Sequence, residues 1–137
     1  MKLKRLAEPV TYTRTVQPVA LPTNCASIGT MCLTTGWGDT LSSNDGSRLQ
    51  ALHLPILDWK NSNHSSFLYD PDTMICAGYI EGAKDSCQGD GGGPLICNSE
   101  LQGIVSWGFE CAKNGYPGVY TRVCKFNDWL EMTMAEN

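Results

Sequence analysis

Short apolar runs separated by glycine and proline are the main pattern along this chain of 137 residues. Short runs of this kind, bounded by turn residues, are typical of β-strands. The pattern predicts strands over residues 49–57, 95–97, 101–106 and 119–123. The sequence Asn44-Asp45-Gly46 predicts a tight turn. We find no internal repeat and no heptad pattern, so the expected class is all-β.

One helix is expected at the end of the chain, over residues 125–137. Asn127 or Asp128 can cap its first turn. The apolar spacing predicts that four side chains face the body of the protein: Phe126, Trp129, Leu130 and Thr133. A second, shorter helical turn is expected to start at the capping residue Asp58 and to run to His64.

Length and composition indicate one globular domain that is not built for nucleic acid. The hydrophobic fraction is 42%, and the formal net charge is −4, which disfavours nucleic-acid binding. No apolar run is long enough to cross a bilayer, so no membrane partner is expected. Residues 1–6 carry charge with no apolar segment behind them, which is not the pattern of a signal peptide. A shortened N-terminus fits this start better than a cytosolic protein does.

Seven cysteines are many for a chain of this length. None lies in a CxxC pair, and the chain has only two histidines, His53 and His64, so a structural zinc site is a poor interpretation. A disulfide framework is the better one, and it predicts a secreted, extracellular protein. Six cysteines allow fifteen pairings, so composition leaves the connectivity open. No metal and no other cofactor is expected.

Five motifs carry a specific chemistry. They are, in chain order, CLTTGWG at 32–38, MICAGY at 74–79, DSCQGDGGGP at 85–94, GIVSWG at 103–108 and PGVYTRVC at 117–124. Their order and spacing resemble those of the trypsin group of chymotrypsin-like serine proteases. The resemblance covers the whole chain but only about the second half of the family's domain.

The resemblance implies a fold. It predicts a single six-stranded antiparallel Greek-key barrel, the second of the family's two barrels, followed by a C-terminal helix. Residues 1–24 correspond to the inter-barrel segment, 25–124 to the barrel and 125–137 to the helix. A lone second barrel would expose the surface that an N-terminal barrel normally covers, which invites association.

The resemblance also implies that the catalytic triad is missing. The family reads Gly-Asp-Ser-Gly-Gly-Pro around its nucleophile, whereas this chain has Gly91 at the serine position. The Ala-Ala-His-Cys and Ile-Val-Gly-Gly motifs of the family are absent, and its catalytic aspartate would fall just before Met1. His53 and His64 are expected to be surface or packing residues, and no other serine has a matching base.

A substrate pocket remains in the resemblance. Asp85 corresponds to the carboxylate at the bottom of the pocket, which selects Arg or Lys. Backbone N–H groups of Gly89 and Gly91 occupy the oxyanion-hole positions. Asp90 matches the residue that receives the family's new N-terminal ammonium, and here it must find another partner or solvent. The remaining substrate-binding positions are Ser86, Gln88, Ser106, Trp107, Gly108 and Gly118.

The resemblance implies three disulfides: Cys25–Cys124, Cys32–Cys97 and Cys87–Cys111. Cys76 is left over, because the cysteine that pairs with its counterpart in the family falls at a position that resembles Ser62 here. We favour a buried free thiol at Cys76 over an intermolecular bridge. Asn63-His64-Ser65 is a glycosylation acceptor pattern in an expected surface loop.

Three functional hypotheses follow. The first is a trypsin-like homologue that does not catalyse but binds peptides or proteins through Arg or Lys side chains. The second is an incomplete sequence of an active endopeptidase, in which Gly91 is an error or a variant. The third is a non-functional gene product that lacks its N-terminal barrel.

Overall fold

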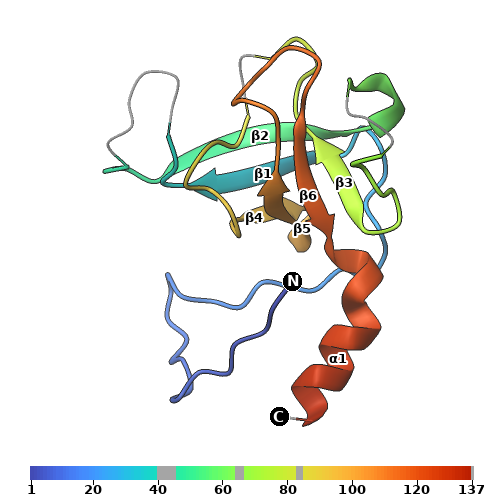
Figure 1. The fold of residues 1–137 in the computed structure, drawn as a ribbon. Helices are drawn as coiled ribbons and strands as arrows, with labels where there is room; N and C mark the ends of the chain where they lie inside the picture. The colour runs from blue at the N-terminus through green and yellow to red at the C-terminus, as the bar shows by residue number, and fades with distance from the viewer. Residues whose placement is uncertain (40–45, 64–66, 83–84, 137) are drawn as a thin grey trace.

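A closed barrel of six antiparallel strands forms the body of the protein (Figure 1). The computed structural model describes residues 1–39, 46–63, 67–82 and 85–136. Neighbouring strands follow the order β1-β2-β3-β6-β5-β4, and β1 pairs with β4 to close the barrel. The strands are β1 Met31–Gly36, β2 Gln50–Leu57, β3 Met74–Ala77, β4 Pro94–Cys97, β5 Glu100–Trp107 and β6 Gly118–Arg122. The all-β prediction and the single six-stranded barrel are confirmed.

Local sequence explains how the strands connect. Strands β4 and β5 are joined by Asn98 and Ser99, whose φ angles are 51° and 66°. A two-residue hairpin with positive φ at both positions is the type I′ arrangement, which matches the twist of the paired strands. Gly46 has a φ of 58°, and Asn44 and Asp45, the other residues of the predicted turn, lie outside the described residues. The turn stays a prediction.

The barrel core is made by alternate residues of its strands. Tyr120 lies at its centre with none of its surface exposed, and its hydroxyl contacts Ser86 Oγ over 3.2 Å. This contact ties the core to the loop that carries the predicted pocket. The other members of the main buried cluster are Cys32, Leu54, Ile56, Ile75, Ala77, Leu95 and Cys97.

Three disulfides brace the barrel, and they are the pairs that the resemblance implies: Cys25–Cys124, Cys32–Cys97 and Cys87–Cys111. Cys76 is free and fully buried. Burial raises the pKa of its thiol to about 12, so it is not a reactive thiolate near neutral pH. Ser62 is the position that resembles the family's cysteine partner of Cys76. Its hydroxyl donates to the carbonyl of Trp59 over 2.7 Å.

The helical predictions need three corrections. The turn after Asp58 is the short helix η1 Trp59–Asn61, and Ser62 is already extended, so the turn does not reach His64. Asp58 does cap it, because its Oδ1 accepts the Lys60 N–H over 3.1 Å. The turn is short because Ser62 returns its N–H to the Trp59 carbonyl and leaves the helical conformation.

The final helix α1 Asn127–Glu136 continues directly from the 3-10 helix η2 Val123–Phe126. Asn127 is therefore not its cap: it is already helical, and its amide donates to the Pro22 carbonyl over 2.7 Å. Leu130 is buried as expected, but Trp129 is 42% exposed, so its predicted inward orientation is wrong. Figure 1 shows the reason: α1 projects away from the barrel, which leaves little protein surface for its sides to pack on.

Candidate ligand-binding site

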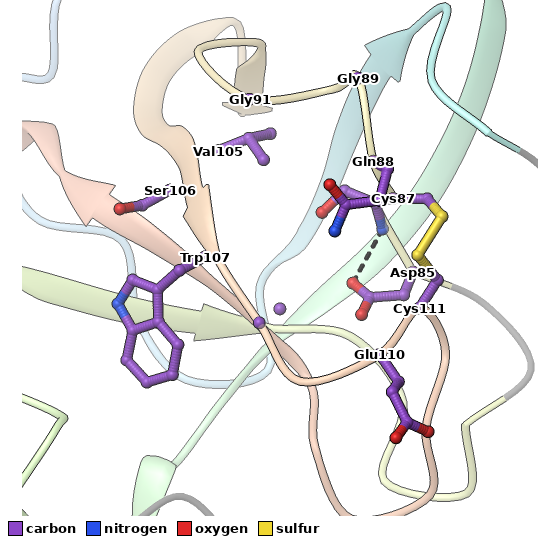
Figure 2. A pocket seen from close by; sticks show the side chains of 13 residues that line it. Asp85, Cys87, Gln88, Gly89, Gly91, Val105, Ser106, Trp107, Glu110 and Cys111 are labelled. Atoms are coloured by element: carbon purple, nitrogen blue, oxygen red, sulfur yellow. Dashed lines mark hydrogen bonds between the residues drawn. A yellow bond between two sulfur atoms is a disulfide. The ribbon is translucent and has the colours of Figure 1, made fainter.

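A pocket of about 350 Å³ opens beside the loop that follows residue 85 (Figure 2). The loop forms one side, and the end of β5 with the start of β6 forms the other. All nine predicted substrate and oxyanion positions line it: Asp85, Ser86, Gln88, Gly89, Gly91, Ser106, Trp107, Gly108 and Gly118. The Cys87–Cys111 disulfide joins the two sides.

Asp85 supplies a partly buried carboxylate to this pocket. The Ser86 N–H donates to Asp85 Oδ1 over 2.8 Å. Burial raises the pKa of Asp85 to about 6, and hydrogen bonds from Ala112 and Ser86 offset only part of that effect. A desolvated carboxylate of this kind is stabilised by a cation placed beside it.

The two wall glycines keep Asp85 accessible. A Cβ on Gly118 would lie 2.6 Å from Asp85 Oδ1, a distance that no real contact allows. A Cβ on Gly108 would lie 4.0 Å from the Gly118 Cα, which is ordinary contact. Position 118 therefore requires glycine for the pocket to keep its shape, whereas position 108 controls only its width.

The loop from residue 89 to residue 92 uses glycine for different reasons. Gly89 has a φ of 91°, and a Cβ there would lie 3.1 Å from the Gly38 Cα. Gly92 has a φ of 83° in open space. Gly91 lies outside the left-handed region, and no heavy atom lies within 4 Å of where its Cβ would be. The backbone at residue 91 thus accepts a side chain, although the sequence supplies none.

Asp90 finds its partners within the protein, in the segment after β1 and in its own loop. Gly38 N–H donates to Asp90 Oδ1 over 2.8 Å, and Cys87 N–H donates to Asp90 Oδ2 over 2.9 Å. A Cβ at Gly36 would overlap the Asp90 carboxylate, so the Gly-Trp-Gly sequence leaves the space that this side chain fills. Of the two expected outcomes for Asp90, another protein partner is the one observed.

Ser106 and Trp107 stand at the end of β5, where the pairing with β6 shifts register between Val105 and Trp107. Such an irregularity re-aims the side chains that follow it. Trp107 packs edge-on against Phe109, with ring centroids 5.8 Å apart. Figure 2 shows Ser106 and Trp107 across the pocket from Asp85.

The remaining candidate residues do not join the pocket. His53 is exposed on β2, and His64 lies outside the described residues. Asn63 is exposed and donates its N–H to the Gly115 carbonyl over 2.7 Å, whereas His64 and Ser65 of the acceptor pattern are not described. Its glycosylation stays a prediction.

The described part of the chain contains no cluster of three His, Cys, Asp or Glu side chains suited to a metal ion. No described helix has the length and apolarity to cross a bilayer.

Sequence reasoning missed two residues of the pocket lining, the apolar Val105 and the charged Glu110. Only Glu110 adds a polar group to the site. It lies between the wall residue Gly108 and the disulfide residue Cys111, and its φ of 47° is unusual for a residue with a side chain. Its place between two pocket residues was the signal that could have identified it.

The barrel and its pocket define a domain of the chymotrypsin-like serine protease class. The family model described as Trypsin matches residues 1–130. The chain belongs to the trypsin family.

Curated relatives agree with this assignment. The chain is similar to Trypsin-1 of Salmo salar, with 58% identity over 134 residues, covering 97% of this chain and 55% of the relative. It is 53% identical over 135 residues to Trypsin II-P29 of Gallus gallus, covering 97% and 54% of the two chains. It is 50% identical over 137 residues to Trypsin of Xenopus laevis, covering 98% and 56%. The chain therefore spans little more than half the length of these relatives.

Proposed function

We propose that this chain binds the basic side chains of peptides or proteins without cleaving them. The observation that carries the proposal is a pocket with a desolvated carboxylate, Asp85, beside a residue without a hydroxyl, Gly91. The Asp85 carboxylate favours a cationic ligand. Gly91 lacks the hydroxyl oxygen that attacks a peptide carbonyl in this family.

The absence of turnover follows from the chemistry of acyl transfer. An acyl-enzyme needs a side-chain nucleophile, and glycine has none. The backbone N–H groups of Gly89 and Gly91 are unaffected by the lack of a side chain, so an oxyanion site alone can persist. Enzymes of this class that lose a triad member keep only about 10³- to 10⁴-fold catalysis over water. We expect no measurable peptide hydrolysis by this chain.

Specificity for Arg and Lys is supported by the pocket's shape as well as its charge. Gly118 leaves Asp85 uncovered, and Gly108 leaves the entrance wide. Long basic side chains can reach a deep carboxylate only through such a glycine-lined channel. The partners we propose are therefore peptides or proteins that expose Arg or Lys, in an extracellular setting that suits three disulfides.

Calorimetric titration with benzamidine tests the binding half of the proposal. Benzamidine should bind, and Asp85→Asn should abolish the affinity. Asp128→Asn, which removes an exposed carboxylate from α1, is the matched control and should leave affinity unchanged. No binding, or binding that Asp85→Asn leaves intact, would overturn it.

Two further measurements test the absence of catalysis. The purified chain should neither hydrolyse an arginine ester nor react with a serine-directed fluorophosphonate. Turnover that the fluorophosphonate blocks would show that another hydroxyl acts as nucleophile.

A second candidate is a working serine endopeptidase, of which this chain is an incomplete sequence with Gly91 as an error or a variant. It is favoured by the open space around Gly91, because a Cβ there would have no heavy atom within 4 Å. Resequencing codon 91 and the transcript upstream of Met1 separates the two. The third hypothesis, a non-functional product, predicts that the purified chain shows no cooperative thermal transition.

A further inference from the structure

Glu110 adds a second carboxylate to the lining of the Asp85 pocket. It follows Gly108 by two residues and immediately precedes Cys111, whose bond to Cys87 fixes this loop across the pocket. Figure 2 shows the Glu110 side chain on the same side of the pocket as Asp85, with its carboxylate pointing away. The disulfide therefore fixes the position of Glu110 at the pocket, while its side chain is 77% exposed to solvent.

The backbone at Glu110 supports a role beyond loop closure. Its φ of 47° lies in the left-handed region, where glycine or asparagine is favoured and glutamate costs free energy. Strained residues of this kind concentrate at functional sites. A residue chosen for the backbone alone would be glycine.

Lys113 forms an ion pair with the Glu110 carboxylate. Its Nζ lies 3.2 Å from Glu110 Oε1, with the Glu110 side chain 77% exposed and the Lys113 side chain 42% exposed. Exposed ion pairs are weak. Lys113 Nζ also lies 5.2 Å from the centroid of the Tyr116 ring, so it keeps a favourable contact if Glu110 turns away.

We propose that Glu110 determines specificity in this pocket by favouring guanidinium and amidinium groups over ammonium groups. A planar guanidinium donates one pair of N–H groups to Asp85 and still carries outward N–H groups. Glu110 turns from Lys113 and accepts one of these. An ammonium is a compact charge that centres on Asp85 alone. The pocket therefore selects Arg over Lys, an inference that rests on the proposed function.

Benzamidine and benzylamine provide the test, because they share a phenyl ring and differ in the cationic group. Glu110→Gln should lower benzamidine affinity about three- to tenfold and benzylamine affinity less than about twofold, measured by calorimetry. Glu110→Gly, which suits the left-handed backbone, should give the same selective loss, so that a folding defect is not the cause. Glu131→Gln, an exposed carboxylate on α1, controls for net charge.

Lys113→Gln completes a double-mutant cycle. The Lys113→Gln variant should bind benzamidine more tightly than the unmodified chain, because Glu110 loses its ion-pair partner. That gain in affinity should vanish when the chain also carries Glu110→Gln. Equal losses for both ligands, no loss, or a Lys113 effect that survives without Glu110 would overturn the inference. If the unmodified chain fails to bind benzamidine at all, the proposed function itself falls, and this result is distinct from a loss of selectivity.

Discussion

Asp90 and Gly38 join the pocket loop to the barrel: the Gly38 N–H donates to Asp90 Oδ1 over 2.8 Å, across 52 positions of sequence. The other carboxylate oxygen accepts the N–H of Cys87 over 2.9 Å. The loop that bears Gly89 and Gly91 is thus fixed by one side chain with two internal acceptors. Among side chains as short as that of aspartate, only aspartate carries two oxygens that both act as acceptors.

Asp90→Asn should loosen this loop. The amide NH₂ would face one of two N–H donors, leaving a part-buried donor without an acceptor, which costs about 1–3 kcal/mol. We expect the free energy of unfolding in urea to fall by that amount and benzamidine affinity to fall with it. Asp128→Asn on the exposed helix should change neither, and equal stability of the two variants would contradict the argument.

Gly91→Ser and Gly92→Ser form a matched pair, because neither position has a heavy atom within 4 Å of the added Cβ. They differ in φ, which is 83° at Gly92 and outside the left-handed region at Gly91. Gly91→Ser should keep or raise the free energy of unfolding by up to about 1 kcal/mol, since the unfolded chain loses freedom. Gly92→Ser should lower it by about 1–2 kcal/mol. Urea unfolding measures both, and equal effects would refute the backbone argument.

The apolar pattern predicted four of the strands, including β2 Gln50–Leu57, but not β1 or β3. In β1 a threonine occupies a core position: Thr34 is buried and donates its hydroxyl to the Pro94 carbonyl over 2.9 Å. Thr34 interrupts the apolar alternation of β1, although its hydroxyl has a hydrogen-bond partner inside the barrel. β3 has only four residues, too few to show a period. Both were located only by the resemblance.

The pocket was predictable residue by residue because its motifs fix the positions of Asp85, Gly108 and Gly118. What the motifs leave free was not predictable. Glu110 lies between fixed positions, and its pocket role depends on a loop conformation that sequence does not show. The partners of Asp90 were also hidden, since backbone N–H donors carry no residue signature, whether they lie 52 positions away, as at Gly38, or three, as at Cys87.

Gly118→Ala should close the pocket. The new methyl group would lie 2.6 Å from Asp85 Oδ1, so either the carboxylate or the strand must move. We expect benzamidine affinity to fall at least about tenfold. Gly108→Ala is the control, because its methyl group would meet only the Gly118 Cα at 4.0 Å, and it should cost much less affinity. Similar losses for the two would mean that width, not access to Asp85, limits binding.

Ligand affinity should depend on the ionisation of Asp85, whose pKa burial raises to about 6. A cationic ligand binds the carboxylate form, and at about pH 5 only about one tenth of Asp85 is ionised. Benzamidine affinity should therefore be about tenfold lower at about pH 5 than at about pH 7.5, since the ligand stays charged over this range. Calorimetry across the range measures it. A flat profile would place Asp85 outside the binding interaction.

Stability of the ligand-free chain should change with pH in the opposite direction. Because the folded pKa of Asp85 lies above the ordinary value of 3.8, the folded state binds more protons than the unfolded state between the two values. The free energy of unfolding therefore gains a contribution below about pH 4 that is lost as pH rises through about 6. Asp70, whose pKa is lowered by hydrogen bonds from Thr73 and Asp72, acts with the other sign in a more acidic range.

Subtracting the urea midpoints of Asp85→Asn from those of the unmodified chain isolates the Asp85 contribution. That difference should decline between about pH 4 and pH 6 and stay level above about pH 7, and a difference that rises with pH would show that Asp85 is ionised and satisfied in the empty pocket.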